Sequence, residues 1–210
     1  MFDLDSLFSE QGPLAQVIND FRARPFQLEM ARAVAETIEH NAVLVAEAGT
    51  GTGKTLAYLV PALMSGGKVI ISSGTKNLQD QLFDRDIPTV RKALKVPVTV
   101  ALLKGRANYV CHYHLERALA GGRLPTREDA RYLALIERFA RASRTGDKAD
   151  CSTVAEGAGV WSYVTSTREN CLGSDCRHYD RCFVMGARKQ ALAADVVVVN
   201  HHLFFADLVL

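Results

Sequence analysis

Residues 48–55, which read Ala-Gly-Thr-Gly-Thr-Gly-Lys-Thr, constrain the fold of this 210-residue chain more than any other segment. An unbroken apolar run, 43–46, precedes them and is expected to form a strand buried on both faces. A predicted helix over 54–64 follows and ends at Ser65-Gly66-Gly67. A strand, a glycine-rich turn and a helix that opens with Lys-Thr are typical of a phosphate-binding loop in a parallel α/β sheet.

The residue types of this loop explain how it would hold phosphate. Gly49, Gly51 and Gly53 permit a tight turn whose N–H groups point inward, and the following helix adds the positive end of its dipole. Lys54 reaches the β- and γ-phosphates, and the Thr55 hydroxyl holds Mg²⁺, which makes these two the candidate catalytic residues. A flexible turn would not explain the Lys-Thr pair. The predicted nucleotide-binding residues are Ala48, Gly49, Thr50, Gly51, Thr52, Gly53, Lys54 and Thr55.

Two positions near the loop leave alternatives open. Ala48 stands where a first glycine is usual in such loops. Gln27 follows Arg24-Pro25-Phe26 at the start of a predicted helix, and its amide can both donate to and accept from the edge of an adenine. Taken alone, Gln27 is better explained as an exposed turn residue, and only the loop downstream favours adenine.

Helix and strand patterns alternate over the first hundred residues. Apolar runs at 69–72 and 98–103 predict two more buried strands, with a helix between them that Thr75 caps and Pro88 closes. From 105 to 190 such runs stop, and a long helix starts at Thr126. Four valines at 196–199 restore the strand pattern. We predict an α/β fold with an incomplete parallel sheet over 1–104 and 191–210, and a mainly helical insertion over 105–190.

Composition narrows the class of protein. Hydrophobic residues make up 48% and charged residues 23%, which excludes a disordered chain. No apolar run approaches the ~18 residues that cross a bilayer, and the acidic N-terminus is unlike a signal peptide. Residues 104–189 hold 15 Lys+Arg against 10 Asp+Glu, so this section carries a net +5. Such a section suggests a polyanion surface, although a solvated face rich in arginine explains the charge equally well.

The cysteines all fall in the basic section. In a reducing cytosol they favour metal or cluster ligation over disulfides. Four thiolates hold either zinc or a 4Fe–4S cluster, and the lack of a Cys-x2-Cys pair favours the cluster. A Cys/His zinc site with His112, His114 and His178 is the alternative, and Cys151 is assigned to packing. The candidate metal ligands are Cys111, Cys171, Cys176 and Cys182.

Four segments together resemble a known family. They are the phosphate loop 47–55, Leu-Lys-Gly-Arg-Ala-Asn-Tyr-Val-Cys at 103–111, Asn-Cys-Leu-Gly-Ser-Asp-Cys at 170–176 and Val-Asn-His-His-Leu-Phe at 199–204. The combination is similar to the DinG/YoaA branch of the XPD-like superfamily 2 iron–sulfur helicases, nearest to its YoaA group, over essentially the whole chain. Ala48 is normal in the phosphate loops of that family.

The resemblance implies an ATP-dependent DNA helicase that moves 5′ to 3′ on single-stranded or forked DNA in repair or replication-fork maintenance. It implies a RecA-like motor domain, Gln27 as the adenine reader, and the four cysteines as ligands of a 4Fe–4S cluster. Ser73-Gly74-Thr75-Lys76 with Gln79 matches the motif that grips the DNA backbone. The insertion would act as a wedge near the strand fork.

The sequence also departs from the family pattern. It contains no Asp-Glu-Ala-His box, which supplies the Mg²⁺-binding and water-orienting acids, and no second RecA-like domain. We therefore expect an N-terminal fragment that binds ATP and DNA without hydrolysing ATP. The resemblance further implies a bacterial cytoplasmic, nucleoid-associated protein without membrane contact. Its partner, the chi subunit of the polymerase clamp loader, would dock on the missing C-terminal part.

Candidate DNA contacts come from basic and aromatic residues. A solvated surface is an equal alternative for each arginine, and burial beside the cysteines is the favoured alternative for Tyr109 and Trp161, which would otherwise stack a base. Two rival functions are a non-enzymatic metal-containing nucleotide- and DNA-binding module and a phosphate-loop kinase. The DNA candidates are Thr75, Lys104, Arg106, Tyr109, Arg177 and Arg181, with Arg188 and Lys189 as further basic candidates.

Overall fold

The computed structural model describes residues 3–121 and 124–208. The chain divides into two compact units, one made of residues 1–102 and 193–210 and the other of residues 103–192. Both boundaries lie two residues from those expected at 104/105 and 190/191. The first unit carries the sheet, and the second unit enters and leaves it as one continuous insertion.

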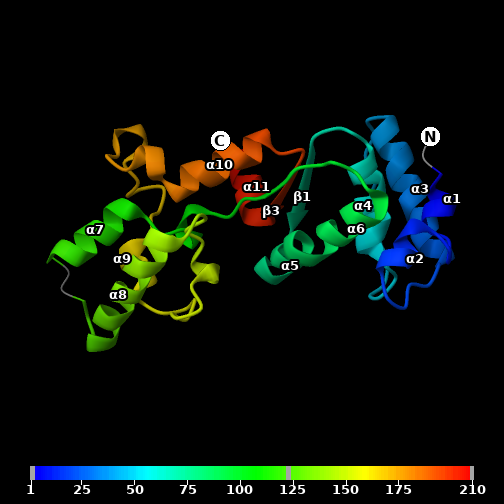
Figure 1. Cartoon of the computed structure of the whole chain (residues 1–210). Helices are drawn as coiled ribbons and strands as arrows, with labels where there is room; N and C mark the ends of the chain where they lie inside the picture. Colours follow the sequence, from blue (N-terminus) through cyan, green and yellow to red (C-terminus); the bar gives the residue numbers. More distant parts are fainter. Residues whose placement is uncertain (1–2, 122–123, 209–210) are drawn as a thin grey trace. The chain divides into compact units, whose positions relative to one another are not determined.

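The sheet of the first unit has three parallel strands in the order β1-β3-β2. They are β1 (Val69–Ser73), β2 (Val100–Leu102) and β3 (Val196–Asn200). Figure 1 shows β1 beside β3, with α11 (His201–Leu208) leading on from the end of β3. All four valines of β3 are buried, as expected of a strand with neighbours on both edges and side chains covering both faces. The predicted parallel α/β sheet is confirmed.

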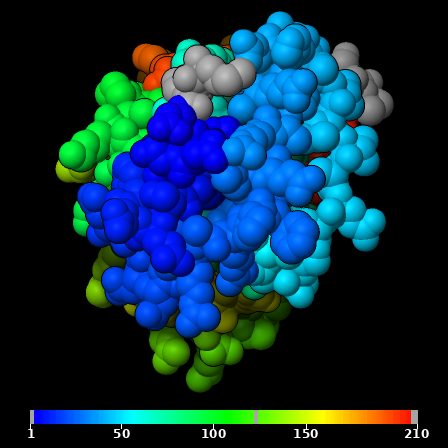
Figure 2. Space-filling view, turned by 90° about the vertical axis from the view of Figure 1, so that its right-hand side faces the viewer, coloured from blue at the N-terminus to red at the C-terminus, as the bar shows by residue number. Residues whose placement is uncertain are grey.

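Helices supply the core of the first unit. Helix α3 packs on α4, and α2 packs on α6. In Figure 2 the N-terminal segment and α3, in blue and lighter blue, occupy the face turned to the viewer. The fully buried side chains include Leu14, Leu59 and Ile87. The helices are α1 (Leu4–Leu7), α2 (Pro13–Val17), α3 (Pro25–Glu39), α4 (Lys54–Met64), α5 (Lys76–Gln81), α6 (Ile87–Leu94) and α11.

The strand predicted at 43–46 is wrong. In the part of the chain that the structure describes, this run pairs with no strand, and the side chains of Val43 and Val45 are 90% and 94% exposed. A buried strand needs a hydrogen-bonded neighbour and cover on both faces, and the sheet of β1, β2 and β3 provides neither at this segment. The apolar pattern is therefore present without the contacts that would make it a strand.

The expectation that Pro88 closes the helix after Thr75 is also wrong. A turn of π-helix, Leu82–Asp86, joins α5 to α6, which continues to Leu94. Pro88 lies in the first turn of α6, where an N–H is not needed for the helical hydrogen bonds. Because the helical period changes at the π-turn, Pro88 falls in the first turn of α6 and does not interrupt the helix.

In the described residues of the second unit, 103–121 and 124–192, the regular elements are helices and short 3₁₀ turns, with one antiparallel bridge between Tyr109 and Asp147 and irregular segments between them. As predicted, Thr126 caps the long helix by accepting a hydrogen bond from the Asp129 N–H. Buried Leu133 and Ile136 of this helix pack in a separate core with Trp161. The helices are α7 (His112–Gly121), α8 (Arg127–Ala142), α9 (Trp161–Val164) and α10 (Phe183–Ala193). Short 3₁₀ turns occur at Arg106–Asn108, Lys148–Asp150, Gly173–Asp175 and Tyr179–Arg181.

Candidate nucleotide and nucleic-acid sites

The phosphate loop, residues 48–55, adopts the backbone that its glycines permit. Gly51 and Gly53 have φ angles of +75° and +84°, a region that side chains with a Cβ rarely adopt. Gly53 is the residue before α4, so the loop turns directly into the helix that begins at Lys54. This arrangement aims the start of α4 at the space that a phosphate would occupy.

Lys54 is held inside the curve of the phosphate loop. Its Nζ donates hydrogen bonds to the carbonyl oxygens of Ala48 and Gly49, each at 2.6 Å. The Thr52 hydroxyl also donates to the Gly49 oxygen, at 3.0 Å. Phosphate oxygens accept stronger, charge-assisted bonds than carbonyls do, so a bound triphosphate would compete well for this ammonium group.

Thr55, the predicted magnesium ligand, makes a side-chain hydrogen bond with Tyr58 one turn along α4. Burial raises the pKa of the Tyr58 phenol, and the bond from Thr55 opposes that rise. Thr55 directly follows Lys54 in the first turn of α4, next to the phosphate loop, which is where a magnesium ligand would be needed.

Gln27 packs directly against the phosphate loop. Only 4% exposed, it donates from Nε2 to the Gly53 oxygen at 2.9 Å. A Cβ at Gly53 would lie 2.1 Å from that nitrogen, so any other residue would displace the Gln27 amide and would also strain the backbone at φ +84°. The Arg24 guanidinium donates to the Gly51 oxygen, a contact that the sequence analysis did not anticipate. Arg24 stands three residues before Gln27 at the entry to α3, and this spacing is the signal that could have identified it.

These side chains share one hollow of about 390 Å³. It joins the predicted adenine reader to the phosphate loop and the start of α4, so its lining offers donors for phosphate and an amide for a base. Its lining residues are Ile18, Asp20, Phe21, Arg22, Arg24, Gln27, Gly51, Thr52, Gly53, Lys54, Thr55 and Leu56.

The segment after β1 packs against β3. Thr75 caps α5 by accepting a hydrogen bond from the Leu78 N–H at 3.2 Å. Gln79 is fully buried and donates to the Val198 oxygen of β3 at 3.3 Å. The predicted DNA motif is thus anchored to the central strand through Gln79, with Thr75 at its start.

The structure brings three of the four predicted ligand cysteines near one another. Burial is the main cause that raises the pKa of the Cys111 thiol, and Cys182 and Cys176 raise it further. Cys111 and Cys182 directly precede α7 and α10 in the chain. Cys171 is exposed. Among the described residues, no group of three or more His, Cys, Asp or Glu is arranged to hold a metal ion.

Comparison with known proteins decides the family. The model of the DEAD/DEAH box helicase family matches residues 24–112. The ATP-dependent DNA helicase YoaA of Haemophilus influenzae is 52% identical over 203 residues, which cover 97% of this chain and 32% of the relative. YoaA of Escherichia coli is 55% identical, and the alignment covers 96% of this chain and 32% of the relative. The ATP-dependent helicase DinG of Mycobacterium tuberculosis is 37% identical, and the alignment covers 87% of this chain and 31% of the relative.

The chain belongs to the DinG/YoaA-type helicases. It spans about a third of the length of the curated relatives that it matches. The mixed α/β unit with its parallel sheet is accordingly the RecA-like fold of a DEAD/DEAH helicase domain. Within the residues that the structure describes, no helix is both long and apolar enough to cross a membrane.

Several residues expected to contact DNA in this DinG/YoaA-type chain are buried. Lys104 is 6% exposed and forms an ion pair with Asp147, Nζ to Oδ2 at 2.8 Å. Tyr109 is 4% exposed, and its hydroxyl accepts a hydrogen bond from the Lys104 N–H at 3.0 Å. Trp161 is 4% exposed and donates to the Ala155 oxygen. The burial alternative holds for Tyr109 and Trp161, and Lys104 likewise has a structural role in this conformation.

The other basic candidates of the second unit stay accessible. Arg177 and Arg181 are exposed, and Arg106 is half-buried. Arg177 pairs with Glu116 at 2.8 Å, while Arg181 donates to Nδ1 of His178, whose Nε2 lies 2.7 Å from the same Glu116. His178, a candidate zinc ligand in the alternative site, therefore has both ring nitrogens engaged. Cys151 is buried in the core of this unit, as its assignment to packing predicted.

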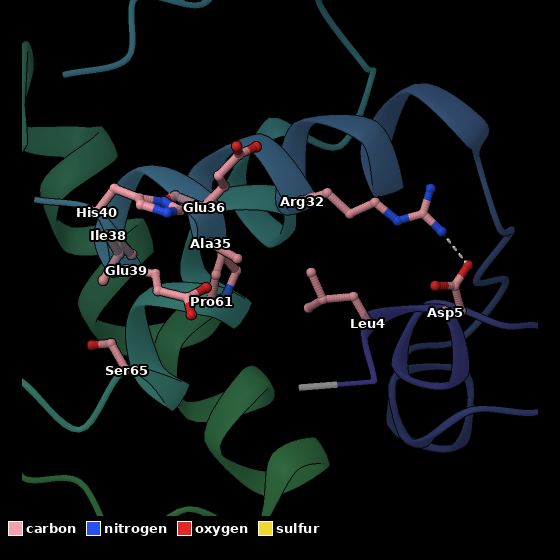
Figure 3. A pocket seen from close by; sticks show the side chains of 10 residues that line it. All are labelled: Leu4, Asp5, Arg32, Ala35, Glu36, Ile38, Glu39, His40, Pro61 and Ser65. Atoms are coloured by element: carbon pink, nitrogen blue, oxygen red, sulfur yellow. Dashed lines mark hydrogen bonds and ion pairs between the residues drawn. The ribbon is translucent and has the colours of Figure 1, made fainter. Parts of the chain in front are cut away.

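A second hollow of about 590 Å³ lies between α1, α3 and α4 (Figure 3). Figure 3 shows Arg32 of α3 paired with Asp5 of α1 at its rim. Glu36 and Glu39 make the lining acidic, and no part of the phosphate loop contributes to it. This hollow therefore has no chemistry that suits a nucleotide.

Proposed function

We propose that the whole protein is an ATP-dependent DNA helicase that moves 5′ to 3′ along single-stranded DNA in repair or at replication forks. This chain would supply the ATP-binding loop and a DNA-binding insertion. The observation that carries the proposal is the single hollow in which Gln27 and Lys54 converge on the glycine turns of the phosphate loop. The relatives from Haemophilus influenzae and Mycobacterium tuberculosis are named ATP-dependent DNA helicase YoaA and ATP-dependent helicase DinG, which supports the same activity here.

ATP would bind with its triphosphate in the curve of the phosphate loop. Its oxygens would replace the carbonyls of Ala48 and Gly49 as partners of Lys54, because an ion pair with hydrogen bonds is stronger than a bond to a neutral carbonyl. Thr55 would hold Mg²⁺ while it donates to Tyr58. Gln27 would read adenine with its amide oxygen and the second hydrogen of Nε2, since the first is used by Gly53.

The second unit would hold a 4Fe–4S cluster through Cys111, Cys171, Cys176 and Cys182. One observation fits this donor set: the Cys111 thiol lies near enough to Cys176 and Cys182 for both to raise its pKa. The ligands come from distant parts of the unit, so a bound cluster would cross-link it. The cluster would thus be structural in this chain.

DNA would contact the chain at two places. The segment that starts α5 would grip the backbone through Thr75, and exposed Arg177 and Arg181 with Arg106 would add positive charge on the second unit. Single-stranded or forked DNA is the expected substrate, with the second unit near the fork as a wedge. The chi subunit of the polymerase clamp loader would bind a part of the protein other than this chain.

Titrations of the anaerobically purified chain test this proposal. We expect it to bind ATP with Mg²⁺, to bind a single-stranded oligonucleotide, and to contain iron. Failure to bind either ATP or DNA would contradict the helicase assignment. Stoichiometric zinc without iron would contradict the cluster alone, and a longer protein that binds both ligands but never unwinds DNA would be a non-enzymatic binding module.

A further inference from the structure

A histidine at the end of the central strand links two strands and is left unused by the site described above. The His201 Nδ1 lies 2.7 Å from the Ser72 Oγ, although the two residues are 129 positions apart in the sequence. Ser73 of β1 is paired with Asn200 of β3, so both strands end at the same level of the sheet. His201 therefore lies at the carboxyl edge, where parallel α/β sheets bind their ligands.

The imidazole of His201 is held in place but stays exposed to solvent. Its ring lies 6.0 Å from that of Phe205, and the Asn200 side chain fixes the first turn of α11 by accepting a hydrogen bond from the Leu203 N–H at 2.7 Å. On its other side runs the backbone of Gly74. A Cβ built there would lie 3.7 Å from Nε2 of the imidazole. Since Nδ1 faces Ser72, Nε2 is the ring nitrogen that remains for a ligand.

The chemistry of this nitrogen points to a phosphate group. A phosphate oxygen only accepts hydrogen bonds, so a bound phosphate requires a hydrogen on Nε2, and a neutral His201 supplies it in the tautomer in which Ser72 donates to Nδ1. The nitrogen lies beside Gly74, and Gly74 and the next residue, Thr75, both belong to the segment expected to grip the DNA backbone. The two residues would thus reach the same stretch of a DNA strand.

We propose that His201 is a DNA-contacting residue whose Nε2–H donates to a phosphate oxygen of single-stranded DNA lying over Gly74 and Thr75. Ser72 is its positioning residue, because the hydroxyl fixes both the orientation of the ring and the nitrogen that carries the hydrogen. The inference rests on the proposed DNA binding and adds a recognition group to it. Because the imidazole is neutral in this form, the contact contributes affinity without releasing a counterion.

Equilibrium titration of the 210-residue chain with a fluorescent oligothymidylate at two salt concentrations tests the proposal. His201→Ala should weaken binding about tenfold, the size of one hydrogen bond to a charged group, while the salt dependence stays unchanged. Loss of a lysine or arginine contact would instead lower the salt slope by about one. His201→Gln, which returns an N–H donor near the position of Nε2, should recover most of the affinity. The matched control is His202→Ala, which removes the adjacent exposed imidazole.

A second variant, Gly74→Ala, distinguishes loss of the phosphate contact from misfolding of the His201→Ala chain. Gly74→Ala places a methyl group at ordinary contact distance from the ring, so it is tolerated by the fold but covers Nε2 and should also weaken DNA binding. A phosphate of the nucleotide is the other candidate ligand of His201, so ATP binding is titrated as well. If the ligand is DNA, the ATP affinity should be unchanged in every variant. A parallel loss of ATP affinity, or binding by His201→Ala equal to that of His202→Ala, would overturn the inference. A wild-type chain that binds no DNA would instead contradict the proposed function itself.

Discussion

At the scale of single residues, Lys54 should discriminate between ATP and adenosine. Each charge-assisted bond from its ammonium group to the phosphates is worth about 1.5–3 kcal/mol, which is about tenfold or more in affinity. Lys54→Ala should therefore weaken ATP binding by at least about tenfold and leave adenosine binding nearly unchanged. Competition titrations with the two ligands measure the difference.

The structure adds a complication that the control must address. Lys54 also bonds to Ala48 and Gly49, so its removal could loosen the phosphate loop. Lys92→Ala, which removes an exposed lysine from α6, controls for the change in net charge. Equal losses of ATP and adenosine binding in Lys54→Ala would show that the loop had collapsed rather than lost one contact.

Asp195 should make the stability of the sheet depend on pH. It precedes β3, and its carboxylate accepts hydrogen bonds from both the N–H and the hydroxyl of Thr99, each at 2.7 Å. The side-chain bond is the main cause that lowers the pKa of Asp195 below its ordinary 3.8. A lowered pKa means that the stabilisation is present at neutral pH and is lost as the pH falls through the folded-state value.

The comparison of Asp195→Ala with wild type measures this effect. The Tm of the variant should be lower than that of wild type at pH 7. This gap between the two Tm values should close as the pH falls below about 4. Asp180→Ala, which removes an exposed carboxylate from the second unit, should give a smaller gap. A gap for Asp195→Ala that does not vary with pH would mean that packing, not the ionised carboxylate, provides the stability.

Residue chemistry was predictable where it depends on local sequence. The glycine turns and the Lys54–Thr55 pair follow from residues 48–55 alone, and the structure shows the positive φ angles that those glycines allow. Burial was the favoured alternative for Tyr109 in the sequence and is confirmed, but the buried role of Lys104 was not predictable, because a basic side chain carries no sign of its burial. Asp147, which pairs with Lys104, lies 43 positions along the chain, and only the fold brings it near.

At the scale of elements, the cysteines should hold the second unit together. Cys171→Ser or Cys176→Ser should remove iron, because a 4Fe–4S cluster normally needs four thiolates. Proteolysis should then cut residues 105–190 faster, since the cross-link between distant segments is lost. Iron content, visible absorption and limited digestion report these changes together.

The matched control for this set is Cys151→Ser. Its thiol is 3% exposed within the apolar core of the unit, so the variant should lose some stability and keep its iron. Iron retained by both Cys171→Ser and Cys176→Ser would remove these residues from the ligand set. Loss of iron in all three variants would indicate general unfolding and would not support separate roles.

Elements were predictable when their signals lie within them. The helix at 54–64 was predicted to the residue, and Thr126 marks the start of α8. The strand prediction for 43–46 was wrong because a strand depends on neighbours that its own residues do not encode. The prediction that Pro88 ends the helix was wrong because the π-turn at Leu82–Asp86 shifts the helical register just before it. Apolar spacing alone does not reveal that shift.

At the scale of the whole molecule, the insertion falls between two strands that are neighbours in the sheet. The chain leaves β2 at Leu102, passes through residues 103–192 and returns to pair β3 with β2 in register, Val100 beside Val196. The insertion was predicted from the loss of apolar strand runs between 105 and 190. The strand order did not follow from the sequence, because it is set by contacts between segments about a hundred residues apart.

This chain on its own should hydrolyse essentially no ATP, with or without single-stranded DNA. Phosphoryl transfer needs Mg²⁺ held by an acidic residue, an oriented water and an arginine finger worth about 10³–10⁵ in rate. The phosphate loop supplies the cradle and Thr55, but the sequence has no Asp-Glu-Ala-His box. Asp195 does not replace it, because it precedes β3 and its carboxylate is bonded to Thr99, whereas ligand groups lie at the carboxyl ends of parallel strands.

Steady-state phosphate release from the purified chain, alone and with oligothymidylate, measures this expectation directly. A DNA titration at two salt concentrations accompanies it, because the basic second unit should still bind DNA weakly, with an affinity that falls steeply as salt is added. The pairing of the two assays matters, since an inactive chain that also fails to bind DNA could simply be misfolded. DNA-stimulated turnover at the rate of a working motor would mean that an acid among these 210 residues completes the catalytic site.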